Sequence, residues 1–242
     1  MRVGIIQSSY IPWRGYFDFI NSVDLFVFYD DVQYTPQNWR NRNLIKTPNG
    51  LQWLTVPVHH DKLSQKINET RISSNQGWKQ KHLRSISQNY SKSSYFSAYI
   101  NEFSAILNSD YETLSDLNKK LIQWLMTCLS IRTPIIDSTS FNLNGKSTQR
   151  LIKLLETVGA DTYLSGPSAS SYLDLNLFRE AGISLEYKTY DYAPYPQLHG
   201  DFAPSVSVLD LMFCMGDKAK DYIKSQSPDT IVLACGDKFG NN

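Results

Sequence analysis

The chain has 242 residues, with 41% hydrophobic and 19% charged side chains and a formal net charge of +1. This length and composition predict a soluble globular protein with one large domain or two small ones, and a sizeable core. The near-neutral charge argues against a surface built for bulk adhesion to nucleic acid or to membranes.

The N-terminal segment predicts a strand, a turn, a helix and a second strand. Residues 2–7 (RVGIIQ) form an apolar run typical of a strand that is buried on both faces. Residues 14–24 place apolar side chains close to helical spacing, and residues 25–29 form the second strand, which ends at the acidic pair Asp30 and Asp31. A β-turn-α-β unit favours a parallel sheet, with ligands at the carboxyl ends of its strands.

Residues 38–125 are predicted to form an insertion made of a hairpin and helices. The Pro-Asn-Gly sequence at 48–50 supplies a turn, because proline fixes φ and Asn-Gly accepts positive φ; residues 44–46 and 51–58 are the arms. Amphipathic helices are expected after the hairpin. They cover residues 76–90, 93–108 and 113–130.

The C-terminal half alternates short strands with helices, which again favours parallel α/β packing. The expected strands are residues 132–140, 161–167 and 184–192, and the expected helices are residues 147–160, 173–183 and 205–216. Residues 219–225 extend the last helix, and residues 229–235 are either a strand or part of a C-terminal tail over 226–242. We therefore predict a single α/β domain over residues 1–242, with a Rossmann-like, mostly parallel sheet flanked by helices, a small β-hairpin and the helical insertion.

The turn after the first strand has the features of an anion site. Backbone N–H groups at the start of a helix are unpaired, and the helix dipole places partial positive charge there. Gly15 admits close backbone approach, and Arg14 adds positive charge. The order Trp13-x-Gly15-Tyr16 also echoes the His-x-Gly-His element of nucleotidylyltransferases, although both histidines are absent; the alternative is a tight turn packed with aromatic side chains. The substrate-binding candidates here are Gln7, Tyr10, Trp13, Arg14, Gly15 and Tyr16.

A second polar cluster follows the second strand. Its paired carboxylates could hold Mg²⁺, act as a base or bind an amino group. Arginine and asparagine suit phosphates and sugar hydroxyls, because Arg offers a bidentate fork and Asn both donates and accepts. The alternative is a solvated loop whose Asn and Asp side chains bond its own backbone. The catalytic candidates are Asp30 and Asp31, and the substrate-binding candidates are Gln33, Asn38, Arg40, Asn41, Arg42 and Asn43.

His82, a serine-rich loop and Lys146 complete the candidates. His82 lies on a predicted helix with several cations and is a reserve catalytic base, although a lone histidine beside aromatic residues is more often structural. A loop after a predicted strand offers Ser165, Gly166 and Ser168 to a phosphate or a carbohydrate, with a helix cap as the alternative. Lys146 precedes a helix and could bind an anion, but the first half of a P-loop is missing, so an ATPase is rejected. No residue is assigned to a metal.

The sequence favours a cytoplasmic location. It contains no run of about 18 apolar residues, so we predict no membrane span. The apolar stretch near the N-terminus is too short for a secretory signal. The cysteines, Cys128, Cys214 and Cys235, are far apart and lack metal-ligand spacing, which is typical of buried thiols in a reducing compartment.

Several segments, read in order, resemble the WbqC-like family of bacterial proteins. They are residues 5–20, 27–58, 163–174 and 202–216. The central string DDVQY…WRNRN…IKTPNG…WLTVPV is long and specific, and the resemblance covers about residues 3–216. The common form of the first motif has Gln-Pro where this chain has Gln7-Ser8. Members are typically encoded in O-antigen and other surface-polysaccharide clusters, and the family has no settled catalytic residues to transfer onto this sequence.

The resemblance implies an enzyme, a transferase that places an acyl or aminoacyl group, with glycine suggested, on an amino-sugar or sugar nucleotide in O-antigen and lipopolysaccharide biosynthesis. Its partners would be a nucleotide-linked amino-sugar and an amino-acid or acyl donor; near-neutral charge argues against extensive nucleic-acid contact. ATP and Mg²⁺ enter if the donor is activated on the enzyme, so the cofactor stays open, as does the oligomeric state. The alternatives are a nucleotidyltransferase-like enzyme using ATP or CTP, and a non-catalytic subunit that binds a sugar or a partner in polysaccharide assembly.

Overall fold

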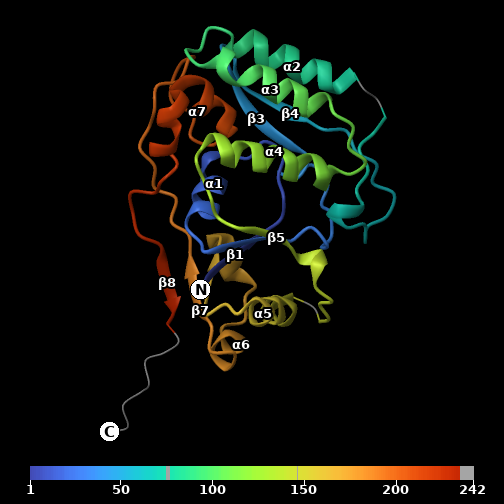
Figure 1. Ribbon diagram of the computed structural model, residues 1–242, viewed down its shortest axis with the longest axis vertical. Helices are drawn as coiled ribbons and strands as arrows, with labels where there is room; N and C mark the ends of the chain where they lie inside the picture. The colour runs from blue at the N-terminus through green and yellow to red at the C-terminus, as the bar shows by residue number, and fades with distance from the viewer. Residues whose placement is uncertain (75–76, 146, 235–242) are drawn as a thin grey trace.

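The computed structural model describes residues 1–74, 77–145 and 147–234. Its centre is a six-stranded sheet in the order β5-β2-β1-β6-β7-β8 (Figure 1). The strands are β1 (Arg2–Ile6), β2 (Leu25–Phe28), β5 (Ile135–Asp137), β6 (Thr162–Ser165), β7 (Ser184–Tyr187) and β8 (Thr230–Leu233). The helices are α1 (Arg14–Asn21), α2 (Gly77–Tyr90), α3 (Phe96–Asn108), α4 (Leu114–Cys128), α5 (Ser147–Val158), α6 (Leu175–Glu180) and α7 (Val208–Met215). The predicted α/β class is confirmed.

The side of the sheet to which successive strands are added changes at β1. β2 and β5 lie on one side of β1, whereas β6 and β7 lie on the other, and all of these pairs are parallel. β8 pairs with β7 in the antiparallel sense at the edge. In open parallel sheets, ligands bind at the carboxyl ends of the strands that flank such a reversal. Here those ends are followed by Gln7 and Gly166.

Helices cover both faces of the sheet, because alternate residues of a strand face opposite sides. Val3 and Ile5 of β1 are buried in a core cluster with residues of α5 and α6. On the other face, α1 lies so close to β1 that a Cβ atom at Gly4 would stand 2.5 Å from the ring of Phe19. Glycine at this position therefore allows the helix to approach the sheet.

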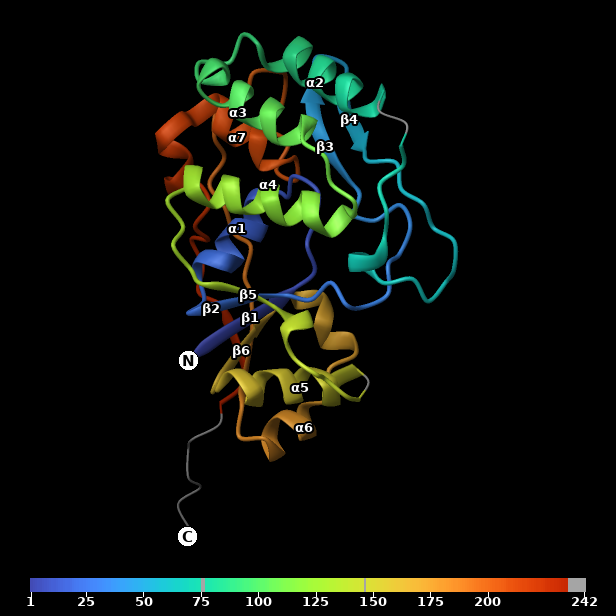
Figure 2. The same ribbon diagram turned by 45° about the vertical axis from the view of Figure 1, so that its right-hand side comes forward.

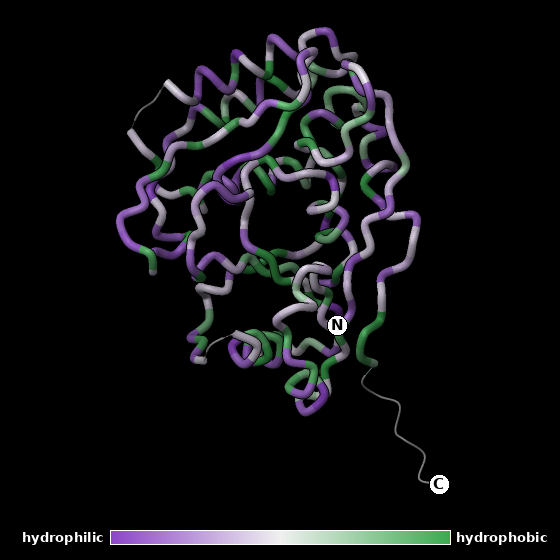
Figure 3. Tube along the Cα trace, turned by 180° about the vertical axis from the view of Figure 1, so that it is seen from behind, coloured by the Kyte–Doolittle hydropathy of each residue, from purple (hydrophilic) through white to green (hydrophobic). Residues whose placement is uncertain are grey.

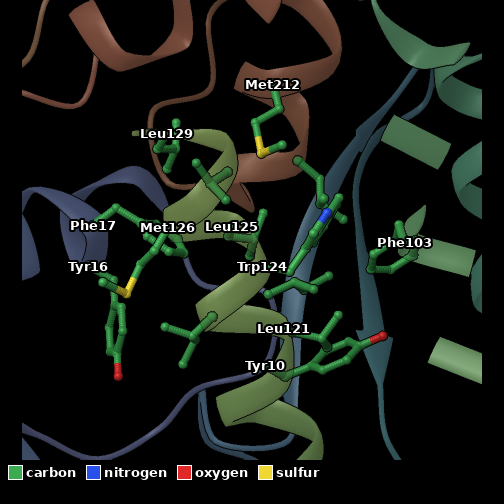
Figure 4. Close-up of a cluster of buried hydrophobic side chains, with 14 of the residues drawn as sticks. Tyr10, Tyr16, Phe17, Phe103, Leu121, Trp124, Leu125, Met126, Leu129 and Met212 are labelled. Atoms are coloured by element: carbon green, nitrogen blue, oxygen red, sulfur yellow. The ribbon is translucent and has the colours of Figure 1, made fainter. Parts of the chain in front are cut away.

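A hairpin and several helices form a second layer beyond α1 and α4 (Figure 2). The hairpin consists of β3 (Arg42–Thr47) and β4 (Gly50–Thr55), and it forms a separate two-stranded sheet. In the chain, the hairpin, α2, α3 and α4 all fall between β2 and β5, where the sequence predicts an insertion. Buried side chains of α4 pack in the hydrophobic core between this layer and α1, as Figure 4 shows. The ring centroids of Trp124 on α4 and Phe103 on α3 lie 5.9 Å apart.

Three local predictions differ from the structure. The expected strand over 184–192 ends early, because β7 covers only Ser184–Tyr187. Only the middle of the expected strand over 132–140 is extended, since β5 is short and a 3-10 turn follows at Ser138–Ser140. The expected extension of the last helix over 219–225 is instead a 3-10 helix over Gly216–Asp221. Gly216 ends α7 with a φ of +54°, in the left-handed region that glycine tolerates and that cannot continue an α-helix.

The C-terminal segment completes the sheet. Residues 229–235, expected as a strand or a tail, contain β8. Lys146 and residues 235–242 lie outside the described residues. Hydrophobic residues concentrate in the central strands and the inner helix faces (Figure 3). None of the helices in the described part of the chain combines the length and the apolar character that a membrane crossing needs.

Candidate functional site

Two cavities adjoin at the carboxyl ends of β1 and β6. The aromatic cavity has a volume of about 430 Å³ and the charged cavity a volume of about 770 Å³, both in the range of small-molecule sites. Gln7, Gly166 and Ser168 line both cavities and form the junction between them. The aromatic cavity is also lined by Ile6, Ser9, Pro12, Trp13, Tyr16, Trp39, Arg40, Asn43, Pro167, Tyr190 and Ser205. The main polar and aromatic residues of the charged cavity are Tyr29, Asp31, Gln33, Lys66, Thr148, Arg150, Tyr163, Ser165 and Tyr172.

The turn between β1 and α1 is fixed by the loop that precedes the hairpin and by β3. Asn43 Nδ2 donates to the carbonyl oxygens of Tyr10 (3.2 Å) and Ile11 (2.9 Å), and the Tyr10 N–H donates to the Trp39 carbonyl oxygen (3.1 Å). Ile11 is buried with a φ of +36°, which a β-branched residue rarely adopts. Such strain persists where surrounding contacts over-determine the backbone, and it clusters at functional sites. The turn is therefore a rigid wall of the aromatic cavity.

Trp13 covers the start of α1. A Cβ atom at Gly15 would lie 2.3 Å from the Trp13 indole, so the ring rests directly on the glycine. The indole also contacts Tyr190 and Tyr192, with ring centroids 5.1 and 5.9 Å away. Gly15 therefore accommodates an aromatic ring, and that ring lines the aromatic cavity.

Gln7 is held at the junction through its main chain. Its carbonyl oxygen accepts hydrogen bonds from Tyr16 Oη (3.0 Å) and Arg40 Nη1 (2.8 Å). The same Arg40 nitrogen donates to the Ser8 carbonyl oxygen (3.2 Å) and to Ser9 Oγ (2.8 Å). Burial lowers the pKa of Arg40, although a guanidinium stays charged in proteins. Arg40 thus positions the junction and adds positive charge to the wall of the aromatic cavity.

An ion pair between Asp31 and Arg150 forms part of the wall of the charged cavity. Ser138 Oγ donates to the second oxygen of the Asp31 carboxylate at 2.6 Å, and the guanidinium lies 4.9 Å from the Tyr29 ring centre. Burial lowers the pKa of Arg150, but the hydrogen bond to Asp31 and its charge outweigh burial, so the pKa is raised. With Lys66, the described lining residues include two cations and one anion. The Lys66 ammonium also lies 3.9 Å from Glu69 Oε1, in a pair that is about half exposed.

Asp30 and Asp31 occupy different environments, although they are adjacent in the chain. Asp30 is fully buried. Its carboxylate accepts hydrogen bonds from the Ser8 N–H (2.7 Å) and Ser115 Oγ (2.5 Å), and Lys119 Nζ lies 3.9 Å away. Asp31, which lies in a bend three residues after the end of β2, is the only one of the pair that lines the charged cavity. The two carboxylates do not form a joint site.

His82 lies on α2 and belongs to the core. Its Nδ1 atom is 2.9 Å from Tyr10 Oη, and its ring packs against Tyr10 and Trp78 with centroids 5.6 and 5.1 Å apart. Burial lowers the pKa of His82 to about 4. The imidazole is therefore neutral at neutral pH, and it lines neither cavity. The geometry gives it a structural role.

Other predicted binding residues also bond the chain itself. Arg14 is buried, and its Nη1 donates to two main-chain carbonyl oxygens at 2.8 and 3.2 Å. Asn41 Nδ2 donates to a main-chain carbonyl oxygen at 3.0 Å, and Asn38 Oδ1 accepts from the next N–H at 2.6 Å. Arg42 stacks on the exposed ring of Trp53.

The structure sorts the predicted site residues into two groups. Those that line the cavities are Gln7, Trp13, Tyr16, Asp31, Gln33, Arg40, Asn43, Ser165, Gly166 and Ser168. Those that line neither cavity are Tyr10, Arg14, Gly15, Asp30, Asn38, Asn41, Arg42 and His82.

Sequence reasoning missed lining residues of both cavities. Tyr190 lies three residues after the end of β7, the next parallel strand, but the sequence predicts a strand over 184–192, which places Tyr190 inside the strand rather than after it. Arg150 lies on the first turn of α5, and Lys66 lies in a loop. No local pattern marks either residue, because only the fold brings them to the charged cavity.

These features define a Rossmann-like α/β protein with a two-compartment cleft at its topological switch point. Within residues 1–74, 77–145 and 147–234, no group of three or more His, Cys, Asp or Glu is arranged to hold a metal ion.

The chain belongs to the WbqC-like protein family, which it matches over residues 7–222. It is also similar to "Uncharacterized protein Rv1507c" of Mycobacterium tuberculosis, with 44% identity over 226 residues, 92% of this chain and 97% of that protein. No solved structure matches the chain.

Proposed function

We propose that the protein is a cytoplasmic transferase that moves an acyl or aminoacyl group, such as glycine, onto an amino-sugar during surface-polysaccharide assembly. The observation that carries the proposal is the pair of adjoining cavities. A transferase must hold donor and acceptor in contact, and two compartments that share Gln7, Gly166 and Ser168 supply that arrangement. The resemblance to the WbqC-like family supports the pathway.

The two cavities favour different substrates. The cations Arg150 and Lys66 in the wall of the charged cavity suit a phosphate-bearing carrier of the activated carboxyl group, because guanidinium and ammonium groups both bind phosphate. The rings of Trp13, Tyr16 and Tyr190 suit the apolar face of a sugar, whose hydroxyls would bond polar groups of the same wall. The donor therefore lies in the charged cavity and the amino-sugar in the aromatic cavity.

The junction is the place of reaction in this proposal. The amine nitrogen attacks the acyl carbon, a C–N bond forms, and the bond from that carbon to its carrier breaks. The proton lost by the amine passes to Asp31 or to solvent, and the carrier leaves as an anion. Gln7 and Ser168 line both compartments, and in this proposal the Gln7 amide and the Ser168 hydroxyl stabilise the oxyanion that develops.

A thermal-shift screen followed by mass spectrometry tests the proposal. Amino-sugars, nucleotide-linked amino-sugars, an acyl-coenzyme A and ATP with Mg²⁺ are added singly and in pairs, with and without glycine. A ligand at 100 times its Kd adds about 2.7 kcal/mol of stability, so binding is readily visible. We expect one phosphate-bearing donor and one amino-sugar to raise Tm together, and the acylated sugar to appear.

Matched variants separate the two compartments. Arg150→Gln should remove the shift caused by the phosphate-bearing donor but keep the shift caused by the amino-sugar. Arg179→Gln changes an exposed arginine of α6 whose side chain donates to Asn176 Oδ1 at 2.8 Å and lines neither cavity, and it should leave both shifts intact. A rise in Tm with ATP or CTP and Mg²⁺ alone would favour nucleotidyl transfer. No change in Tm with any of the ligands would favour a non-catalytic binding subunit.

A further inference from the structure

An exposed aromatic surface continues the aromatic cavity onto the hairpin. Trp39 is 44% exposed and Trp53 of β4 is 42% exposed, and their ring centroids lie 5.4 Å apart with the planes inclined by 42°. The Arg42 guanidinium lies 4.2 Å from the centre of the Trp53 ring. We call Trp39, Arg42 and Trp53 the tryptophan platform.

The platform is connected to the cleft through Trp39. This residue also lines the aromatic cavity, so a ligand that leaves the cavity on this side meets the indole of Trp39 and then that of Trp53. The hairpin holds Trp53 outward, because β4 buries Leu54 in the core and neighbouring side chains of a strand face opposite sides. The cavity and the platform therefore form one continuous surface.

We propose that the tryptophan platform binds the outer rings of an oligosaccharide whose terminal amino-sugar lies in the aromatic cavity. A pyranose ring presents an apolar C–H face that packs on indole, and hydroxyl oxygens at its edge that accept hydrogen bonds from a guanidinium. The inclined indoles and Arg42 offer both kinds of contact. The proposal deepens the proposed function and rests on it for the ligand of the aromatic cavity: the acceptor is a glycan chain rather than a single sugar.

Other occupants fit the platform less well. A stable protein interface buries about 800 Å² on each partner, far more than two tryptophan side chains and one arginine offer. A nucleobase site that discriminates among bases needs donors and acceptors facing the base edge, whereas the platform offers ring faces and one cation. The surface therefore favours a ligand that is recognised by stacked rings and edge hydroxyls.

The test uses the full chain and the indole N–H signals of its five tryptophans in a ¹⁵N-labelled sample. The signals of Trp39 and Trp53 are assigned with Trp39→Phe and Trp53→Phe. The probes are glucosamine, its β-1,4-linked tetramer and uridine monophosphate. We expect the tetramer to move both platform signals and to bind roughly tenfold more tightly than the monomer, which corresponds to about 1.4 kcal/mol.

Variants decide whether the platform causes this difference. Trp53→Ala should bring the affinity for the tetramer down to that for the monomer and leave the affinity for the monomer unchanged, since Trp53 lines neither cavity. Trp53→Phe should retain part of the gain. Ile231→Ala, which truncates a 66% exposed side chain on β8, is the control and should change nothing.

The opposite results would overturn the inference. A tetramer that binds no more tightly than the monomer, or an unchanged tetramer affinity in Trp53→Ala, excludes the platform as a glycan site. Platform signals that respond to uridine monophosphate alone would make it a nucleobase site, and signals that move with protein concentration would make it a contact between copies of the chain. If the wild-type protein binds the tetramer but transfers no acyl group, the proposed function is refuted, whereas the platform remains a glycan-binding site.

Discussion

The two cavities meet at one junction, yet polar groups serve different purposes in their walls. Around the aromatic cavity, Arg40 and Asn43 bond oxygen atoms of the chain and fix the strained turn. In the charged cavity, Arg150 pairs with Asp31, a side chain that itself faces the cleft. The comparison teaches that a polar residue type does not by itself mark a ligand-binding group. Arg40 and Asn43 line the aromatic cavity, yet their side chains already donate hydrogen bonds to the turn.

The adjacent carboxylates of Asp30 and Asp31 also differ in role, because one is bonded within the fold and the other lines a cavity. Asp30 joins the end of β2 to the turn through the Ser8 N–H and to α4 through Ser115. Asp31 lines the charged cavity. Variants that treat the two carboxylates alike should therefore have different consequences, and the predictions below run from the largest expected effect to the smallest.

Asp30→Asn should destabilise the fold by about 3 kcal/mol, because a buried carboxylate that accepts two hydrogen bonds and faces a cation is replaced by a group with half its acceptors. Asp31→Asn is the matched control and should cost about 1 kcal/mol, since its pair lies at a cavity wall. Urea unfolding measures both. Equal losses of stability would contradict the division between scaffold and cleft.

His82 should make stability depend on pH. The folded protein keeps the imidazole neutral down to a pKa of about 4, whereas an unfolded histidine takes up a proton near pH 6.5. Protons therefore bind the unfolded state preferentially, so the stabilisation is complete above pH 6.5 and is lost as pH falls toward 4. Between pH 7 and pH 5 the loss should be about 2 kcal/mol.

The comparison of wild type with His82→Gln identifies the source of this slope. Glutamine can accept the Tyr10 hydroxyl hydrogen bond but does not titrate, so the variant should lose less stability than the wild type between pH 7 and pH 5. Thermal unfolding in matched buffers gives both slopes. An identical slope in the two proteins would assign the pH dependence to other groups.

The fold was more predictable than the site, for a physical reason. Strand and helix patterns are local, so residues 2–7 and the Pro-Asn-Gly turn predict β1 and the hairpin correctly. Predicting the residues of the cleft requires knowing which side chains keep unbonded polar groups after folding, and the sequence does not reveal this. Arg14 is an example. Its position beside a helix start predicts anion binding, yet the fold buries it against main-chain carbonyls.

The strand-end rule succeeded close to the carboxyl ends of the parallel strands. Gln7 directly follows β1, Asp31 lies three residues after β2, Ser165 is the last residue of β6, and all three line the cleft. The rule could not reach Arg150 or Lys66, which come from a helix and a loop that tertiary packing places beside those strand ends. Non-local contacts of this kind leave no periodic signal in a single sequence.

Gly15→Ala should disturb the aromatic cavity alone. The new Cβ atom would lie 2.3 Å from the Trp13 indole, so the ring must move. Overpacking costs about 1–3 kcal/mol, and the higher helix propensity of alanine offsets up to about 1 kcal/mol, for a net loss of about 1–2 kcal/mol. Tryptophan fluorescence should report the displaced indole, and donor binding in the charged cavity should persist. Unchanged fluorescence would mean that Trp13 does not rest on Gly15.

The smallest effect concerns the ion pair itself. In a double-mutant cycle with Asp31→Asn and Arg150→Gln, the coupling energy in stability should be about 1 kcal/mol, because both side chains border the cleft and remain 12% and 15% exposed. Added phosphate should stabilise the Asp31→Asn variant more than the wild type, because Arg150 then loses its competing carboxylate. The same addition should not stabilise the double variant. A coupling near zero together with an equal phosphate response in all proteins would show that Arg150 serves the cleft independently of Asp31. The contrast between the walls would then rest on the main-chain hydrogen bonds of Arg40 and Asn43 alone.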